Sequence, residues 1–464
     1  MFRTTPSHAL PVMVATVGAM AAVLVLAAAP ASASFFQIAE TCPSGLGNAF
    51  AGGAAAAEDA CTVWFNPAGM TRLDDKQFVI GVHSIQPELE FTDAGSRIFT
   101  GAPLVGSDGG DAGESATVPN LYYTQKIGTD MAWGIGINPP FGLTTEYTPD
   151  WIGRYHGIRS EITTVNINPA FAFRVSPQLS IGFGLDYQTI DAELTQAVDL
   201  GSTCLALTLQ GRVAPGTCAF LGLAPQLSDA LAEVKADDDA FGWNLGFLWE
   251  PNPDFRIGFS YRSELSYDAE GTSRITTFTP GQGIFASTIG LTDSGAKAPV
   301  DVPEIISLSF FWQASTKWSL MGDASQTGWS SLPELRIEFD NGSPDSVVTL
   351  GLDDSIKYTL GATYQGSPKW ALRLGLALDE TPVPNEELRT PRLPDDDRTW
   401  YTIGFDYNPS SKIGLSFAYG RIDIDEARIE KTALPGSEDF LRGGLRGDFD
   451  FGVSILSGQL KISF

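Results

Sequence analysis

From residue 76 onward, apolar side chains alternate with small or polar ones along most of the chain. After the turn at Ser176-Pro177, apolar residues stand at positions 179, 181, 183 and 185, with Ser, Gly and Asp between and after them. Further stretches with the same alternation begin at positions 133, 255, 370 and 413. Strict alternation is typical of β-strands with one apolar face. The pattern therefore predicts a protein built of such strands.

Six tight turns separate these stretches, and two of the longer, more polar connections between them are Leu200–Asp239 and Gly271–Lys297. The tight turns are Gly128–Asp130, Ser176–Gln178, Pro251–Asp254, Ser315–Lys317, Gly366–Lys369 and Pro409–Lys412. Short turns at one end and long loops at the other are typical of outer-membrane β-barrels, whose short turns face the periplasm. Six turns join seven hairpins. This predicts an all-β membrane protein, a fourteen-stranded antiparallel transmembrane β-barrel over residues 76–464 with both termini in the periplasm.

The positions of aromatic residues indicate that lipid, and not water, surrounds this barrel. Trp133, Trp318 and Trp370 each follow a tight turn by one to three residues, where an interfacial girdle is expected. The chain ends in Leu460–Phe464, with apolar side chains at alternate positions and a terminal aromatic. This ending resembles the assembly signal of outer-membrane barrels. It predicts the barrel-assembly machinery as a partner, whereas a strand that simply ends in Phe is the plainer alternative.

The first 33 residues read as a secretory signal peptide. Arg3 precedes an almost wholly apolar run over residues 12–29, and Ala31-Ser32-Ala33 fits the small-residue cleavage pattern. An uncleaved anchor is the alternative. We expect the mature chain to begin near Ser34 and to be exported.

Four cysteines follow the cleavage site, at 42, 61, 204 and 218. Exported proteins meet an oxidising compartment, and each neighbouring pair lies in one segment of the chain. Two local disulfides, Cys42–Cys61 and Cys204–Cys218, are the simplest interpretation. A metal site would need CxxC spacing or neighbouring histidines, which the sequence lacks, so we expect no metal.

Charge and chemistry narrow the function. Acidic residues outnumber basic ones by 55 to 29, giving a formal charge of −26, which argues against nucleic acid as a partner. His83 and His156 alone remain after cleavage, and neither stands in a nucleophile or metal-ligand pattern. We therefore expect neither enzymatic activity nor a cofactor, although a barrel lipid hydrolase stays an alternative. Acidic loops are expected where divalent cations bridge lipopolysaccharide.

Residues 34–75 do not alternate and are rich in Gly and Ala, with a turn-forming Asn66-Pro67-Ala68-Gly69. A free periplasmic tail would carry more charge and fewer small residues. We therefore expect this segment to be a hatch, a small plug inside the barrel lumen.

The sequence resembles the FadL family of outer-membrane transporters for long-chain fatty acids and hydrocarbons. The resemblance begins in the hatch and continues in order to the C-terminal third. The matching blocks are Phe36-Gln37, Ser44–Phe50, Ala57–Ala60, Asn66–Ala68, Phe141–Tyr147, Phe241–Asn244, Tyr261–Glu264, Thr381–Pro384 and Pro394–Arg398. The resemblance implies a hatched monomeric barrel of the Gram-negative outer membrane that takes up hydrophobic molecules by passive, ligand-gated diffusion.

Two features are assigned to the path of the ligand. Two successive prolines in Asn138-Pro139-Pro140 predict a kink in the third strand, because proline cannot donate to the sheet. In the family such a kink opens a lateral window to the membrane, and a bulge without a window is the alternative. The resemblance also places the start of the hatch at the ligand chamber, so we expect a gate at Ser34, Phe35 and Phe36, with Asn66, Pro67 and Ala68 in the same hatch.

Apolar residues in the outer loops are candidates for ligand capture. Trp151, Ile152 and Tyr155 follow the third strand. Leu223, Leu227 and Leu231 recur every fourth residue, which predicts a helix beginning near Pro225. The alternative is that this helix only packs its own loop closed.

The substrate is less well specified. Fatty-acid-transporting relatives hold the carboxylate with basic lumen residues, but the corresponding positions here are Gln196 and Val348. Neither pairs a carboxylate as a cation does. Arg154, Arg159 or Arg212 are candidate substitutes. Long-chain fatty acids come first on the resemblance, neutral hydrocarbons second, and a general porin is the alternative that the hatch disfavours.

Overall fold

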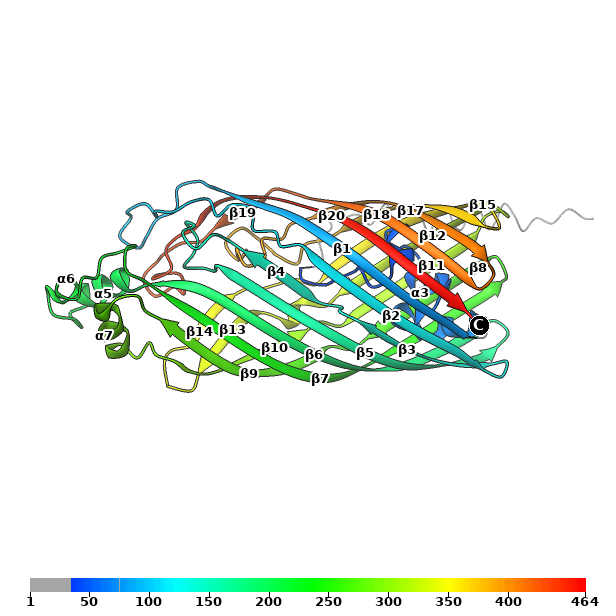
Figure 1. The fold of residues 1–464 in the computed structure, drawn as a ribbon, viewed down its shortest axis with the longest axis horizontal. Helices are drawn as coiled ribbons and strands as arrows, with labels where there is room; N and C mark the ends of the chain where they lie inside the picture. The colour runs from blue at the N-terminus through cyan, green and yellow to red at the C-terminus, as the bar shows by residue number, and fades with distance from the viewer. Residues whose placement is uncertain (1–34, 75) are drawn as a thin grey trace, which may run out of the picture.

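The computed structural model describes residues 35–74 and 76–464, so the predicted signal peptide (1–33) and Ser34 lie outside the described residues. The described chain forms a closed fourteen-stranded antiparallel barrel, as predicted (Figure 1). β1 pairs with β20 from Gln77↔Ser463 to Asp93↔Gly447, which closes the sheet. Eight spans are single strands: β1 (Lys76–Asp93), β2 (Ala116–Ile127), β5 (Arg159–Ser176), β6 (Leu179–Asp199), β7 (Asp229–Asn252), β16 (Trp370–Asp379), β17 (Arg398–Ser410) and β20 (Arg446–Ser463).

The other six spans are each broken once. They are β3 (Met131–Asn138) with β4 (Gly142–Glu146), β8 (Phe255–Arg262) with β9 (Leu265–Thr276), β10 (Ser294–Val302) with β11 (Ile305–Gln313), β12 (Trp318–Thr327) with β13 (Glu334–Phe339), β14 (Ser346–Thr349) with β15 (Ser355–Ser367), and β18 (Ile413–Ile424) with β19 (Ala427–Glu430). The sequence predicted only the break between β3 and β4, at the two prolines.

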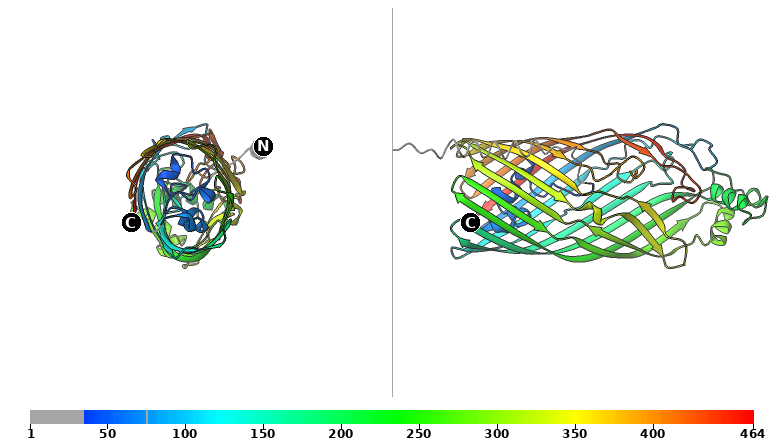
Figure 2. Two further views of the ribbon diagram at one scale, coloured as in Figure 1. Left: turned by 90° about the vertical axis from the view of Figure 1, so that its right-hand side faces the viewer. Right: turned by 180° about the vertical axis from the view of Figure 1, so that it is seen from behind.

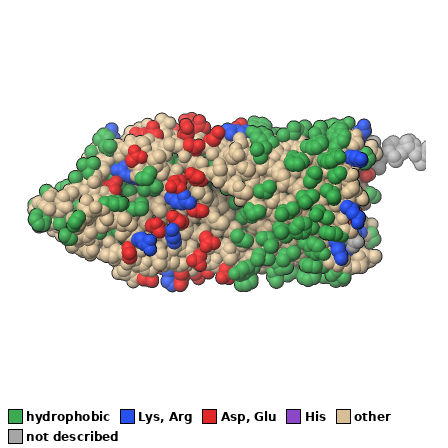
Figure 3. Space-filling view, viewed as in Figure 1, with side chains coloured by type: hydrophobic (Ala, Val, Ile, Leu, Met, Phe, Trp, Pro, Cys, Tyr) green, Lys and Arg blue, Asp and Glu red, His purple; other side chains and the backbone are tan. Residues whose placement is uncertain are grey.

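The two faces of the wall follow the alternation of the sequence. In β16, Leu372, Leu374, Leu376 and Leu378 are exposed, whereas Arg373 between them is buried toward the bore. An apolar band covers the half of the barrel that carries the short turns, and a belt of mixed charge lies above it (Figure 3). No helix among the described residues is long and apolar enough to cross a membrane. The band marks the part of the sheet that faces lipid.

All six tight turns lie where the sequence placed them, but the long connections are shorter than predicted. β6 runs to Asp199 and β7 begins at Asp229, so the loop covers residues 200–228 rather than 200–239. Likewise β9 ends at Thr276 and β10 begins at Ser294. Above the apolar band the outward face of the strands is polar, so the alternation fades while the backbone pairing continues.

Two of the outer loops carry three helices at the outer tip, α5 (Leu200–Leu209), α6 (Thr217–Phe220) and α7 (Pro280–Thr288) (Figure 1). The helix predicted near Pro225 is wrong. Gly222 has a φ of +69°, which ends helical structure after α6, and Leu231 belongs to β7. The carboxylate of Asp199 instead caps α5 by accepting from the backbone nitrogen of Ser202 at 2.8 Å.

The hatch lies inside the bore (Figure 2). It contains four short helical segments: α2 (Pro43–Leu46), α3 (Gly53–Ala56), α4 (Thr62–Phe65) and the 3₁₀ segment η1 (Pro67–Arg72). A second 3₁₀ segment, η2 (Trp329–Ser331), fills the break between β12 and β13. The hatch is held between opposite walls, because α2 contacts β18 and β20 while α3 contacts β8 and β11.

Candidate functional site

Three cavities follow one another from the outer loops to the wall of the barrel. The outer cavity, about 250 Å³, lies between the outer parts of the strands and the loops above them, and its lining includes Gln196 and Arg392. The second, an apolar chamber of about 90 Å³, is lined by Arg392, Phe35 and Phe36. The third, about 380 Å³, is lined by the same two phenylalanines and by Pro139. Shared residues therefore link the three cavities into one path.

Aliphatic side chains from many strands enclose the apolar chamber. They include Ile162, Ile190, Val234, Val300, Ile337 and Val348. Ser160, Thr390 and Arg392 are its polar residues. Val348, one of the two positions that the sequence singled out for the ligand, thus contributes to an apolar wall on β14. The chamber can bury an acyl or hydrocarbon chain and offers a polar group at one side.

Arg392 is buried without a carboxylate partner in the part of the chain that the structure describes. Its Nη1 donates to Ser160 Oγ at 2.9 Å and its Nη2 donates to Gln196 Oε1 at 2.9 Å. Its Nε is buried and has no acceptor. Burial and the nearby Arg442 lower the pKa of Arg392 to about 9, so the guanidinium is still charged at neutral pH. A buried, uncompensated cation is a ready site for an anion.

The sequence did not single out Arg392. The arginines that it did single out either pair with carboxylates or are exposed. Arg154 pairs with Asp229 at 2.8 Å. Arg159 forms ion pairs with the carboxylates that flank it, including Glu161 at 2.6 Å. Arg212 is exposed at the outer tip. Gln196, expected at a ligand position, instead accepts from Arg392 and orients it.

Residues 35–38, which we call the gate segment, separate the apolar chamber from the third cavity. Phe35 and Phe36 are buried against Trp329, with ring centroids 5.5 and 4.9 Å apart, and Phe36 also packs on Phe141 at 5.7 Å. Arg398 Nη2 donates to the carbonyl oxygen of Phe35 at 3.1 Å. The phenylalanines thus close the path with aromatic packing.

The gate segment also pairs with the kink in the third span. The backbone nitrogen of Gly142 donates to Phe36 O at 3.0 Å, and that of Ile38 donates to Pro140 O at 2.8 Å. Gln37 and Phe141 form an antiparallel bridge between these two bonds. The start of the hatch is therefore a short extra strand that lies along the interrupted span.

The barrel wall is open beside this kink. Pairing between β2 and β3 stops at Leu121↔Ile137, and β4 pairs with β5 but not with β2 among the described residues. The third cavity has inward-facing lining residues, such as Trp400, and outward-facing ones, such as Val165. The cavity therefore crosses the wall through the gap between β2 and β4.

The depth of this gap follows from strand geometry. β3 has 8 residues between the periplasmic turn and the kink. At about 3.3 Å per residue and a tilt of about 40°, the kink lies roughly 20 Å above that turn. An apolar band in such barrels is about 25 Å tall. The gap thus lies within the band, toward its outer edge.

Most of the remaining hatch, residues 42–73, which we call the hatch body, is fixed to the wall by buried polar contacts. Arg373 of β16 pairs with Glu58 at 2.6 Å and with Asp406 of β17 at 2.7 Å. The amide nitrogen of Asn66 donates to Phe247 O at 3.0 Å. Asn66, Pro67 and Ala68, predicted as part of the hatch and gate, lie in the hatch body against β6 and β7 and not in the gate segment.

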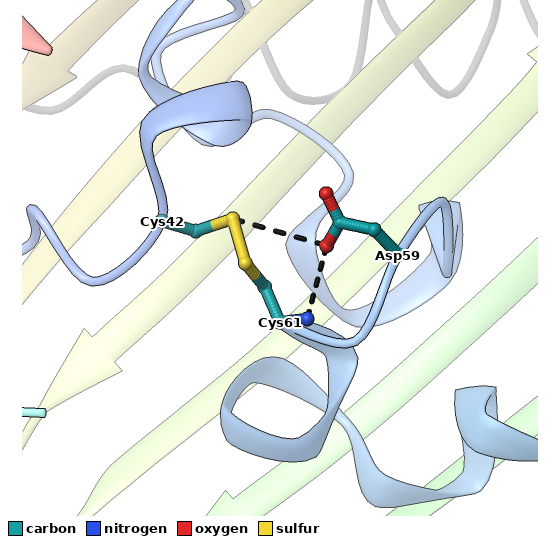
Figure 4. A group of neighbouring side chains, drawn as sticks. All are labelled: Cys42, Asp59 and Cys61. Atoms are coloured by element: carbon teal, nitrogen blue, oxygen red, sulfur yellow. Dashed lines mark hydrogen bonds between the residues drawn. A yellow bond between two sulfur atoms is a disulfide. The ribbon is translucent and has the colours of Figure 1, made fainter. Parts of the chain in front are cut away.

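A disulfide joins Cys42 to Cys61 within the hatch body, the pairing that the spacing favoured (Figure 4). The carboxylate of Asp59 lies beside it and accepts from the backbone nitrogen of Cys61 at 2.9 Å. The same carboxylate accepts from Gln459 Nε2 of β20 at 2.8 Å. Because the two sulfurs are bonded to each other, they offer no thiolate to a metal ion. The second disulfide, Cys204–Cys218, joins α5 to α6.

The predicted capture residues of the outer loops do not form one surface. Trp151, Ile152 and Tyr155 are buried in a loop core, where Trp151 stacks on Tyr147 with ring centroids 3.9 Å apart. Among the other three, Leu223 is buried, Leu227 is exposed and Leu231 is partly buried in β7. None of the six lines the three cavities. Five of the six thus pack within the protein, and Leu227 is the one that is exposed to water.

Known proteins are similar in sequence to this chain over most of its length. The family model for outer membrane protein transport proteins (OMPP1/FadL/TodX) matches residues 24–464. A long-chain fatty acid transport protein of Escherichia coli O6:H1 is 31% identical over 418 residues, which cover 88% of this chain and 91% of that protein. Outer membrane protein P1 of Haemophilus influenzae is 30% identical over 421 residues, 86% and 88% of the two chains.

Solved structures share the fold. A Pseudomonas aeruginosa FadL homologue aligns with a TM-score of 0.84 at 24% identity, covering 93% of this chain and 100% of that one. The toluene transporter TodX of Pseudomonas putida aligns with a TM-score of 0.61 at 17% identity, covering 87% and 94%. With the hatched barrel and the sequence matches together, this chain belongs to the OMPP1/FadL/TodX family of outer-membrane transport proteins.

Proposed function

We propose that this protein takes up long-chain fatty acids across the outer membrane and holds the carboxylate at Arg392. The observation that carries the proposal is the buried guanidinium at the edge of an otherwise apolar chamber, with Nε lacking an acceptor. The relatives named as long-chain fatty acid transport proteins support the same substrate class. Neutral hydrocarbons, the second candidate, are supported by the toluene transporters among the structural relatives.

Physical chemistry favours the fatty acid over the neutral hydrocarbon. Each methylene buried in the chamber contributes about 0.8 kcal/mol for either ligand. Only a carboxylate also gives Arg392 a charge-assisted hydrogen bond, which contributes about 1.5–3 kcal/mol. A hydrocarbon would bury the cation further and leave Nε without an acceptor, which costs free energy.

The gate segment and the gap give a route for passive transport. A chain that fills the apolar chamber competes with Phe35 and Phe36 for the same space, because these side chains line both the chamber and the third cavity. Displacing them also removes the backbone hydrogen bonds between residues 36–38 and the kink at residues 140–142. The ligand then passes through the gap at Asn138-Pro139-Pro140 into the outer part of the membrane, down its own concentration gradient.

The outer surface of the barrel suggests further partners. Acidic and basic side chains mix in the belt above the apolar band (Figure 3), which suits lipopolysaccharide bridged by divalent cations. An exposed Phe464 follows β20, which suits recognition by the barrel-assembly machinery. One chain closes the barrel, so a monomer suffices for transport, and no enzymatic activity is part of the proposal.

The test compares ligands with and without a carboxylate. For Arg392→Gln we expect the affinity for oleate to fall about 30-fold, corresponding to about 2 kcal/mol, and the affinity for oleyl alcohol to change less than about threefold. Arg159→Gln, at a partly buried arginine with its own carboxylate partners, serves as the matched control. Equal losses for both ligands would show that Arg392 only supports the chamber. An unchanged oleate affinity would show that the carboxylate binds at another place in the protein.

A further inference from the structure

A hairpin in the outer half of the barrel forms part of the wall of two cavities (Figure 1). We define the flap as residues 334–349, which contain β13, β14 and the turn between them. Its side chains Leu335, Ile337 and Val348 line the apolar chamber, and residues 343–346 line the outer cavity. The flap therefore borders the ligand path where the outer cavity meets the apolar chamber.

The apolar chamber is small in this structure. Its volume is about 90 Å³. An engineered apolar cavity of about 150 Å³ in another protein holds one benzene molecule. A chain longer than a few methylene groups therefore fits into the chamber only if one of its walls moves outward.

The wall is incompletely paired where the flap meets β10. β13 pairs with β10 at two positions near the turn of the flap, and the turn adds hydrogen bonds to residues 290–295. Residues 298–303 and 329–337 do not pair with each other in the described part of the sheet. Pro303 and Pro333 lie on the two sides of this seam, and proline cannot donate to a ladder. On this side the flap is thus fixed by its turn and not along its length.

Side chains, and not a neighbouring strand, hold the other edge of the flap. β14 pairs with β13 along its whole length and with no further strand among the described residues. Arg442, from the loop before β20, donates from Nη1 to Val347 O at 2.9 Å and from Nη2 to Ser346 Oγ at 3.2 Å. The carboxylate of Glu438 accepts from the backbone nitrogen of Thr349 at 3.1 Å. We call these two side chains the latch.

The ion pairs of the flap lie within the flap. Arg336 pairs with Glu334 at 2.7 Å and with Asp345 at 2.6 Å. Moving the flap outward as one body therefore breaks none of these pairs. The contacts that such a movement must break at the β14 edge are those of the latch.

Arg442 is also in contact with the ligand path, because it lines the outer cavity together with Arg392. Its carboxylate partner Asp439 lies 3.6 Å away. The acceptors that the flap offers to Arg442 are a carbonyl and a hydroxyl oxygen, which are neutral. A carboxylate forms charge-assisted and often bidentate hydrogen bonds with arginine, about twice as strong as neutral ones. A ligand carboxylate in the outer cavity therefore competes with the flap for Arg442.

We propose that the head group of the ligand releases the latch. A carboxylate in the outer cavity draws Arg442 away from Val347, the β14 edge of the flap swings outward, and the apolar chamber widens to take the chain. The proposal rests on the proposed function, because it uses the same chamber and the same head group. Arg442 acts first, and Arg392 holds the carboxylate once the chain has entered.

The test uses the mature protein in lipid nanodiscs and compares a ligand that carries a carboxylate with one that does not. In Arg442→Met the flap is unlatched without a ligand, so we expect the affinity for oleyl alcohol to rise about tenfold, because more of the protein is ready to bind. The affinity for oleate should change less than about threefold, because losing the latch and losing the attraction of Arg442 have opposite effects.

The matched control is Arg428→Met. Arg428 is exposed, pairs with Glu386 and Glu430, and lines none of the three cavities. We expect no change in the affinity for either ligand. A loss of affinity for both ligands in Arg442→Met would show that Arg442 only supports the wall, which overturns the latch.

Hydrogen exchange tests the latch without depending on the site of the carboxylate. In residues 346–352 we expect exchange at least about tenfold faster in ligand-free Arg442→Met than in the wild type, and oleate should accelerate the same residues in the wild type. Glu438→Ala, which keeps Arg442 in place, should shift ligand-free exchange in the same direction. Exchange that is equal in all three proteins, or unaffected by bound oleate in the wild type, overturns the latch and leaves the proposed function standing. Failure of the proposed function appears separately, as an unchanged oleate affinity in Arg392→Gln.

Discussion

The hatch body and the gate segment are parts of one plug, but different forces hold them in the barrel. The hatch body is held by ion pairs and side-chain hydrogen bonds, such as Arg373 with Glu58 and Asp59 with Gln459, and by an internal disulfide. The gate segment is held by aromatic packing, two backbone hydrogen bonds to the kink and the bond from Arg398 to Phe35 O.

This difference indicates which part of the plug can move. Removing one partner of a buried ion pair leaves an uncompensated charge and costs several kcal/mol. Moving an aromatic side chain out of an apolar site costs less when another apolar group takes its place. An acyl chain is such a group. We therefore expect the body to be the fixed part of the plug and the gate segment to be the exchangeable part.

The largest effect should come from breaking the anchor of the body. Arg373→Met leaves Glu58 and Asp406 without their shared cation, so we expect the free energy of unfolding in guanidinium to fall by about 3 kcal/mol. The matched control is Arg421→Met, because Arg421 pairs with Asp423 on the surface. There we expect a change below about 1 kcal/mol. Similar small effects of both variants would mean that the body is not anchored by charge.

An intermediate and local effect is expected in the gate segment. Phe36→Ala removes a buried aromatic ring, which destabilises the closed position by about 3 kcal/mol. Hydrogen exchange should speed up in residues 35–41 and stay slow in the hatch body, with little change in global unfolding. Phe50→Ala is the control, because it truncates a buried ring within the hatch body. Acceleration throughout the hatch in the Phe36 variant would contradict separate movement.

The smallest effect we expect is a change of folding stability with pH, caused by a carboxyl group close to the gate segment. Burial, together with neighbouring acidic groups, raises the pKa of Asp397 to about 7; these groups are Asp396, Asp425, Asp395 and Glu380. The folded state therefore binds a proton more tightly than the unfolded chain, so the stabilisation is present below about pH 4 and lost as pH rises through 7.

Asp397 precedes Arg398, which holds the carbonyl of Phe35. Between pH 5 and 8 we expect the wild type to lose less than about 1 kcal/mol of stability through this group, because Asp397 is only partly buried. In Asp397→Asn that part of the pH dependence should vanish from unfolding curves recorded at the two pH values. An identical pH dependence in the two proteins would assign the titration to other groups.

Local patterns were enough to predict the wall and the plug. Alternation located the strands, tight turns set their number, and the small residues of 34–75 indicated a segment packed inside the bore. The predicted break at Asn138-Pro139-Pro140 also lies between two strands, because proline acts on the backbone itself. These features depend on short stretches of chain and so are visible in the sequence.

The proposed ligand site depends on contacts between distant segments, which explains what the sequence missed. Arg392 is distinctive because no carboxylate of the described residues pairs with it, and a sequence does not show such an absence. Gln196 and Val348 line the two cavities that Arg392 also lines, where Gln196 orients the cation and Val348 packs in an apolar wall. Leu223, Leu227 and Leu231 have helical spacing, yet Gly222 and the start of β7 at Asp229 prevent a helix.

On the proposed route, the width of the gap between β2 and β4 limits which molecules can leave. Residues 116–120 of β2 pair with β1 but with no strand on their other side among the described residues. Within hydrocarbon, each backbone N–H or C=O without a partner costs several kcal/mol. A wider opening would strip more of these bonds from the sheet. We therefore expect the gap to stay narrow and to pass slender linear molecules more readily than bulky, branched or multi-ring ones.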